Sequence, residues 1–195
     1  MTLNFACSAL LIIDVQNDFC PGGALAVKDG DRVIEPLNRL SSLFAENGGR
    51  VIATQDWHPV DHVSFKDLWP SHCVQGSEGA AFHASLDLKP VNLIVRKGFR
   101  RALDSYSAFF ENDRQTSTGL DGYLKTLSID TLVLGGLATD YCVLYSALDA
   151  VGLGYKTIVA ADAVRGVDYP AGSTERALKT LEEAGVTFAA SGEIQ

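Results

Sequence analysis

The chain has 195 residues, of which 47% are hydrophobic and 21% charged, and this balance predicts one globular domain spanning residues 1–195. Lys and Arg number 16 against 24 Asp and Glu, so the formal net charge is −8. Nucleic acids and anionic membrane surfaces are bound by concentrated positive charge, so neither is an expected partner. A small neutral or cationic ligand suits this chain better.

The apolar runs and the cysteines indicate where in the cell the protein is expected. No apolar span approaches the length of a membrane-crossing helix, and the segment from Met1 to Val15 lacks the basic start and cleavage site of a signal peptide. The cysteines show no paired short spacing; they are Cys7, Cys20, Cys73 and Cys142. Reduced thiols in the cytoplasm are therefore expected, in a monomer or a homo-oligomer.

Short apolar runs predict six strands. The first run, Ala9 to Val15, is almost continuously apolar, as is typical of a strand buried on both faces of a parallel sheet. The predicted strands cover residues 9–15, 50–54, 91–95, 131–134, 157–161 and 186–189.

Between these runs, apolar residues recur at helical spacing. One helix begins near Val33 and stops at Asn47, Gly48 and Gly49. Further helices are predicted at 120–127, 139–151 and 174–184. Strands that alternate with helices predict an α/β protein, namely a three-layer α/β/α single domain with a six-stranded, mainly parallel sheet.

In such sheets ligands bind outside the carboxyl ends of the strands. Candidate residues lie at or just after the ends of predicted strands: Asp14, the segment that starts at Asp56, Lys97 and Cys142. We therefore expect these residues to form one site, although the order of the strands cannot be read from one sequence.

Cys142 lies in the stretch GGLATDYCV, where an apolar run meets two glycines and a predicted helix. Thr139 is a suitable N-cap, which places Cys142 in the first helical turn. Unpaired N–H groups and the helix dipole favour a thiolate there, so Cys142 is a candidate nucleophile. The alternative is a buried cysteine that packs as a small hydrophobe.

Lys97 and Asp14 are each ambiguous when taken alone. A lysine beside a glycine is usually a solvated surface group, and an aspartate after a strand often caps a turn. If both lie next to Cys142, the ammonium lowers the pKa of the thiol and the carboxylate shuttles a proton. Asp14, Lys97 and Cys142 would then be base, electrostatic partner and nucleophile.

The long stretch from Gln55 to Pro90 contains a carboxylate and several imidazoles, at Asp56, His58, His62 and His72. Such a set suits one divalent ion such as zinc, iron or manganese, with positions left open for water or substrate. The alternative is a polar loop with scattered histidines and no metal. Cys73 is a weaker candidate ligand, because a strand-like geometry would turn it away from its neighbour His72.

Aromatic residues occur close in sequence to these candidates, at Phe19, Trp57, Trp69 and Tyr106. Each alone suits an ordinary core or lid position, but a flat heteroaromatic substrate would need such walls. His83 has no comparable neighbours, and we interpret it as structural or surface.

Taken together, these motifs resemble the nicotinamidase/pyrazinamidase family of the isochorismatase-like cysteine hydrolase superfamily. The resemblance covers most of the chain, and the matching motifs occur in the same order as in the family. The matching strings are LLIIDVQNDFCPGGAL, ATQDWHP with DHVSF, WPSHCVQGSEGA, RKG with DSYSAF, GLATDYCV with ALDA, and AADAVRGVD.

The resemblance assigns roles to individual residues. It implies that Asp14, Lys97 and Cys142 are the catalytic triad. It implies metal ligands at Asp56, His58 and His72, with His62 as a fourth contact in some members. The positions that line the nicotinamide pocket match Phe19, Trp69 and Tyr106. The family also has a cis peptide before the residue matching Ala138, which directs the N–H groups of Ala138 and Cys142 into an oxyanion hole.

The implied activity is hydrolysis of nicotinamide to nicotinate and ammonia through a cysteine thioester, in NAD salvage, and deamidation of pyrazinamide as well. Two alternatives remain open. One is a metal-independent amidohydrolase of the same superfamily that acts on carbamoyl or ureido compounds. The other is a non-catalytic module that binds a pyridine compound.

Overall fold

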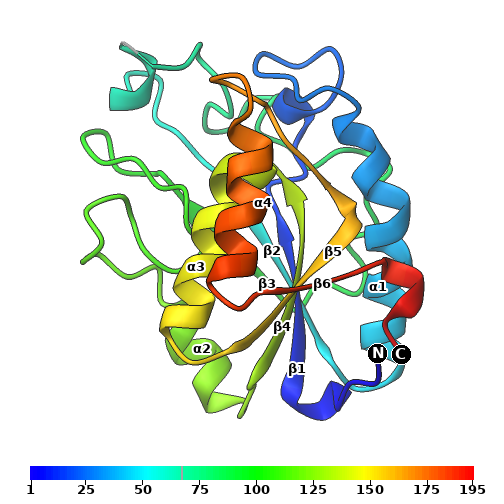
Figure 1. Ribbon diagram of the computed structural model, residues 1–195. Helices are drawn as coiled ribbons and strands as arrows, with labels where there is room; N and C mark the ends of the chain where they lie inside the picture. Colours follow the sequence, from blue (N-terminus) through cyan, green and yellow to red (C-terminus); the bar gives the residue numbers. More distant parts are fainter. Residues whose placement is uncertain (67) are drawn as a thin grey trace.

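The computed structural model describes residues 1–66 and 68–195, and a six-stranded sheet runs through the middle of the molecule (Figure 1). The strands are β1 (Ser8–Ile13), β2 (Arg50–Asp56), β3 (Leu93–Lys97), β4 (Thr131–Leu137), β5 (Lys156–Arg165) and β6 (Thr187–Ala189). Their order is β3-β2-β1-β4-β5-β6, and every neighbouring pair is parallel. The predicted α/β/α architecture is confirmed.

The central strand β1 pairs with β2 on one side and with β4 on the other. The chain first builds the sheet outward from β1 through β2 to β3, and then returns to add β4, β5 and β6 on the opposite side. The direction of winding therefore changes between β1 and β4. The carboxyl ends of strands at such a point leave a crevice in which ligands bind.

Helices cover both faces of the sheet (Figure 1). The helix α1 (Ile34–Glu46) packs on one face, whereas α2 (Leu120–Thr126), α3 (Leu144–Gly152) and α4 (Ser173–Glu183) pack on the other. All residues of β1 are buried because its side chains alternate between these two cores. Every helix described falls short of the length and apolar character needed to cross a membrane.

All six strands differ from their predicted ranges: β1 runs from Ser8 to Ile13 and ends before Asp14, β2 continues to Asp56, and β6 begins at Thr187. The third strand begins at Leu93 rather than residue 91 and includes Lys97. The fifth extends from Lys156 to Arg165, well beyond residue 161, with a register shift opposite Leu134 and Gly136. The fourth strand does not turn at its two glycines but continues to Leu137. These extensions bring the strand ends closer to the crevice.

Gly136 explains why β4 continues through its glycines. Its φ is +127°, a conformation that residues with a side chain rarely adopt. A Cβ atom built at this position would lie 2.1 Å from the carbonyl oxygen of Ile13. A glycine is therefore required for β4 to lie alongside the end of β1.

We expect Gly136→Ala to lower the free energy of unfolding by at least about 2 kcal/mol, because the new methyl group meets fixed backbone in a strained conformation. Urea denaturation followed by circular dichroism measures this change. Gly122→Ala in α2 is the control, since its Cβ would meet nothing within 4 Å. That variant should gain up to about 1 kcal/mol. Equal stability of the two variants would contradict the steric argument.

Candidate active site

The candidate residues come from four neighbouring strand ends. Asp14 directly follows β1, Asp56 and Lys97 are the last residues of β2 and β3, and Cys142 lies in the turn after β4. Asp56 and Lys97 are also register partners in the sheet. The side chains expected to share a site therefore lie at one edge of the sheet.

The Lys97 ammonium group lies at the centre of this site. Its Nζ is 2.8 Å from Asp14 Oδ2 and 3.5 Å from Cys142 Sγ, and it also forms an ion pair with Asp56 Oδ1. It donates to the carbonyl oxygen of Ser105 at 3.0 Å. The Lys97 side chain has 0% exposure. This excludes the surface interpretation, because a buried ammonium needs such partners.

Asp14 is held in place by the neighbouring strand. Thr54 Oγ1 donates to Asp14 Oδ1 at 2.6 Å, and the Asp14 N–H donates to the same hydroxyl at 3.1 Å. Asp14 is fully buried and has φ of +47°. Its carboxylate accepts a hydrogen bond from Thr54 and forms an ion pair with Lys97. An ordinary turn cap would instead accept from backbone N–H groups of its own turn.

Cys142 lies in an unusual first turn. Residues Thr139–Val143 form one π-helical turn that leads into α3. The N-cap position is Ala138, not Thr139 as the sequence predicted, and its carbonyl accepts from the N–H groups of Tyr141 and Val143 at 3.1 Å. π-Helical turns within helices are frequent at functional sites.

The peptide bond between Leu137 and Ala138 is cis, as the family resemblance implied. Across residues 1–66 and 68–195, no backbone carbonyl accepts from the N–H of Ala138. This donor is therefore available to a ligand at the start of the Cys142 turn.

Lys97 lowers the pKa of the Cys142 thiol, as expected, but other effects outweigh it. Burial raises the pKa of Cys142 well above its ordinary value; Lys97 opposes this rise, whereas Asp14 and Asp56 add to it. Two carboxylates and a dry environment outweigh one ammonium and the helix terminus. The net shift of the pKa favours the thiol over the thiolate.

The pKa values of the other buried charged groups, Asp14, Asp56 and Lys97, shift in different directions. Burial raises the pKa of Asp14, and Lys97 offsets only part of that rise. Burial would also raise the pKa of Asp56, but Lys97 and His58 hold it well below its usual range. Burial lowers the pKa of Lys97, yet the two carboxylates together raise it well above its ordinary value. Asp14 is thus the carboxylate that takes up a proton more readily.

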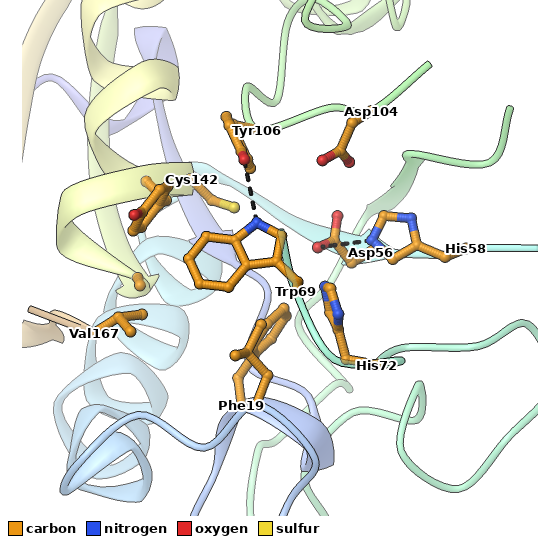
Figure 2. A pocket seen from close by; sticks show the side chains of 12 residues that line it. Phe19, Asp56, His58, Trp69, His72, Asp104, Tyr106, Cys142 and Val167 are labelled. Atoms are coloured by element: carbon orange, nitrogen blue, oxygen red, sulfur yellow. Dashed lines mark hydrogen bonds and ion pairs between the residues drawn. The ribbon is translucent and has the colours of Figure 1, made fainter. Parts of the chain in front are cut away.

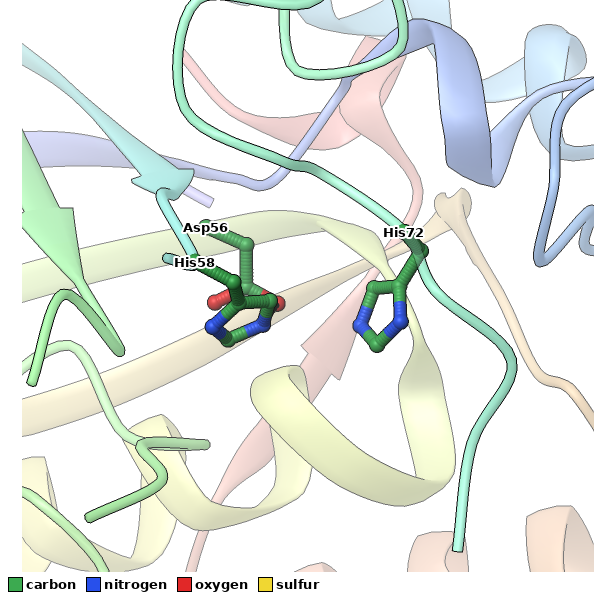
Figure 3. Close-up of side chains that lie close together, drawn as sticks. All are labelled: Asp56, His58 and His72. Atoms are coloured by element: carbon green, nitrogen blue, oxygen red, sulfur yellow. Dashed lines mark ion pairs between the residues drawn. The ribbon is translucent and has the colours of Figure 1, made fainter. Parts of the chain in front are cut away.

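Asp56, His58 and His72 converge with ligand atoms that all lie within 4.8 Å of one another (Figure 3). His58 Nδ1 is 2.8 Å from the carbonyl oxygen of Gly98, and His72 Nδ1 is 2.8 Å from that of Pro70. These bonds place the proton of each ring on Nδ1 and leave Nε2 as the donor to a metal. A carboxylate and two imidazoles arranged in this way fit one divalent ion.

Two further side chains lie beside this trio. The His62 ring stacks on His58 with centroids 4.2 Å apart, and its nitrogens already contact Ser64 Oγ and the Leu103 carbonyl. Cys73 belongs to none of the possible ligand groups found among the described residues. The reason we gave for Cys73 is wrong, because its backbone is left-handed, with φ of +45°, rather than strand-like.

A pocket opens between Cys142 and the trio, and aromatic rings form its walls (Figure 2). The predicted wall residues Phe19, Trp69 and Tyr106 all line it, and Trp69 Nε1 donates to the Tyr106 hydroxyl at 3.2 Å. Trp57 does not line this pocket; the Arg96 guanidinium lies 3.9 Å from its ring centroid.

Sequence reasoning missed several lining residues, which are Leu25, Asp104, Tyr141 and Val167. Tyr141 could have been suspected because it directly precedes the candidate nucleophile. Val167 lies in the loop after β5, and only the fold brings that loop to the pocket.

The fold and these side chains define the class: an α/β/α protein with a cysteine-centred site at the carboxyl edge of a parallel sheet. Residues 8–193 match the model of the Isochorismatase domain. The chain belongs to the isochorismatase domain family.

Particular relatives are similar over almost their whole length. The nicotinamidase of Escherichia coli (strain K12) is 44% identical over 92% of this chain and 93% of its own. The crystal structure of PnC1 from L. infantum in complex with nicotinate is 37% identical, covers 100% and 98% of the two chains, and has a TM-score of 0.94. The pyrazinamidase of Pyrococcus horikoshii in complex with zinc is 35% identical, with 94% and 99% covered and a TM-score of 0.85.

We expect His58→Ala to weaken metal binding by at least about 100-fold, because even loss of a group behind a metal ligand costs 10- to 100-fold. Elemental analysis of the purified variant measures the bound metal. His83→Ala is the matched control, since the His83 ring contacts the backbone of Ser85 rather than the trio. Wild-type metal content in His58→Ala would refute this assignment.

We expect Lys97→Met to lower the free energy of unfolding by about 3–5 kcal/mol, because it leaves two buried carboxylates without their cation. Lys125→Met removes an exposed ion pair with Asp121 and should cost less than about 1 kcal/mol.

The loss in Lys97→Met should also depend on pH. Without the ammonium, the pKa of Asp14 rises further, so the folded variant binds a proton more readily than the unfolded chain does. The stability gap to wild type therefore narrows as the pH falls. Urea titrations at several pH values measure the gap, and a constant gap would contradict the role of Lys97.

Proposed function

We propose that this protein hydrolyses nicotinamide to nicotinate and ammonia through a thioester on Cys142, a reaction of NAD salvage. One observation carries the proposal: the Cys142 sulfur, with Lys97 and Asp14 behind it, shares an aromatic-walled pocket with the trio Asp56, His58 and His72. The similarity to nicotinamidases over almost the whole chain supports the same activity.

The pocket suits a flat ring that carries one carboxamide. Phe19, Trp69 and Tyr106 offer aromatic surfaces against which a pyridine ring can pack. Asp56, His58 and His72 would hold a divalent ion, which would supply a Lewis acid for the ring nitrogen, directly or through a bound water, and this contact would orient the carboxamide toward Cys142. Imidazole and carboxylate donors suit zinc, iron and manganese alike, and the zinc complex of the similar Pyrococcus horikoshii pyrazinamidase favours zinc.

The first half-reaction forms the thioester. Cys142 Sγ attacks the carboxamide carbon while its proton passes to Asp14, and the N–H groups of Ala138 and Cys142 donate to the developing oxyanion. Asp14 then gives this proton to the amide nitrogen as the C–N bond breaks. Ammonia leaves, and the nicotinoyl group remains bound to the sulfur as a thioester.

The second half-reaction restores the enzyme. Asp14 removes a proton from a water molecule, whose oxygen attacks the thioester carbon at the same oxyanion donors. The C–S bond breaks, the sulfur regains a proton from Asp14, and nicotinate is released. The raised pKa of Asp14, caused by its burial, suits a group that must both accept and donate the proton.

Lys97 acts in both halves without exchanging a proton. Its pKa is raised by Asp14 and Asp56, so it stays charged and stabilises negative charge on the sulfur while a bond forms or breaks. It also keeps the Asp14 carboxylate directed toward the sulfur.

We also propose a second substrate and a cellular location. Pyrazinamide presents the same carboxamide on a flat diazine ring, so we expect it to be deamidated as well. The four cysteines are all unpaired, which suits the reducing environment of the cytoplasm.

We expect Cys142→Ala to release no ammonia from nicotinamide while still binding it, because only the sulfur that forms the thioester is lost. A coupled assay measures ammonia, and isothermal titration calorimetry measures binding. Cys20→Ala removes a thiol that does not line the site pocket and should keep wild-type turnover.

The same assays separate the alternatives. Ammonia release by Cys142→Ala would exclude the nucleophile. Binding of nicotinamide without turnover by the wild type would favour a pyridine-binding module. Release from a ureido compound but not from nicotinamide, unaffected by a chelator, would favour the metal-independent amidohydrolase.

A further inference from the structure

Asp140 lies two residues before the nucleophile and is 5% exposed. Its side chain turns away from the reacting groups and binds the loop between β5 and α4. Asp140 Oδ1 accepts from the Val167 N–H at 3.0 Å, and Oδ2 accepts from the Asp168 N–H at 2.8 Å. Oδ2 also accepts from the hydroxyls of Ser173 at 2.5 Å and Thr174 at 3.3 Å.

The loop that Asp140 binds forms one wall of the substrate pocket. Val167 lines the pocket, and Figure 2 shows its side chain beside those of Trp69 and Phe19. The ring of Tyr169 lies 6.3 Å from that of Trp69, and the Tyr141 hydroxyl donates to the Tyr169 carbonyl. Two consecutive residues before Cys142 therefore bind the same wall.

The loop lies between β5 and α4 and belongs to neither. It therefore lacks the regular backbone hydrogen bonds of a strand or a helix, and its position depends on contacts such as those with Asp140. Asp168 has φ of +55°, so the backbone turns sharply where Asp140 binds it. Hydrogen bonds from backbone N–H groups to a carboxylate are stronger than those between neutral groups. Asp140 is thus the main polar anchor between the nucleophile turn and the Val167 wall.

We propose that Asp140 is a positioning residue, which holds the Val167 wall at a fixed distance from Cys142 and thereby sets how tightly the pocket holds a flat pyridine carboxamide. This inference rests on the proposed function and assigns a residue that acts on substrate binding through the loop. Asp140 and Cys142 lie in one turn but have different roles. Asp140 affects substrate binding, whereas Cys142 forms the thioester.

The contacts also explain why the residue is aspartate rather than asparagine. Each carboxylate oxygen accepts from a different backbone N–H, of Val167 or of Asp168. An asparagine would place its NH₂ group against one of these N–H groups in either orientation of the amide. Because backbone N–H groups cannot accept, one contact must break and the wall must move.

The test is steady-state kinetics of Asp140→Asn with nicotinamide and with a nicotinamide methylated on the ring. We expect KM for nicotinamide to rise by about 10-fold or more while kcat changes less than about threefold, which is the signature of lost binding common to ground and transition states. The preference for nicotinamide over the methylated compound should fall, because the wall no longer limits the width of the pocket.

Asp162→Asn is the matched control. Asp162 binds Ser191 in the same manner, through its N–H at 2.7 Å and its hydroxyl at 2.6 Å, but it lines no part of the site pocket. An asparagine there can keep both contacts, because the Ser191 hydroxyl can accept from the NH₂ group, so this variant should lose little stability and keep the wild-type KM. Thermal denaturation and metal content of both variants verify that each is folded and loaded.

An unchanged KM in Asp140→Asn would overturn the inference, and so would a fall in kcat with KM unchanged, because the residue would then act on the nucleophile turn. If Asp140→Asn does not fold, Ser173→Ala removes one contact of the same carboxylate and should raise KM more modestly; an unchanged KM there also overturns it. Absence of ammonia release by the wild type would instead refute the proposed function.

Discussion

The buried ammonium of Lys97 is the constraint on which the site depends. A cation at 0% exposure is stable only if charged partners surround it, and that charge comes from Asp56 on the adjacent strand β2 and from Asp14 just after β1. Asp56 also belongs to the trio with His58 and His72, so the same ion pair connects the sulfur end of the pocket to the metal end. The contacts of Lys97 therefore link the Cys142 sulfur to the carboxylate of this trio, whereas His58 and His72 lie in the loop between β2 and β3.

The sheet makes this convergence possible. Strands β3, β2, β1 and β4 are adjacent and parallel, so their carboxyl ends deliver Lys97, Asp56, Asp14 and the Cys142 turn in that spatial order. Gly136 lets β4 lie close to β1, since its missing side chain would meet Ile13. Around this rigid edge, loops supply the walls, and Asp140 attaches one of them to the nucleophile turn. The strand ends thus hold Asp14, Asp56 and Lys97, while Cys142 and most of the pocket walls lie in the segments that connect the strands and helices.

Much of this could be predicted from the sequence, for identifiable physical reasons. Buried parallel strands appear as continuous apolar runs, as in Ala9 to Ile13, and residues just beyond such runs must meet at one edge. Strand ends were less predictable, because Gly135 and Gly136 signal a turn locally but pack within the sheet. The net pKa shift of Cys142 could not be predicted, since it arises mainly from burial, with opposing effects of Lys97 and of Asp14 and Asp56, and this balance depends on the folded geometry. The role of Asp140 could not be predicted either, because the fold brings its partners Val167 and Asp168 to it.

The most direct test of the central claim is to locate the covalent intermediate. Wild-type protein is mixed with nicotinamide, quenched in acid within the first turnover, digested and analysed by mass spectrometry. The account predicts a nicotinoyl group on the peptide that contains Cys142, formed as ammonia appears and lost as nicotinate appears. Ammonia release with no acyl group on that peptide, or with the group on another residue, would contradict it.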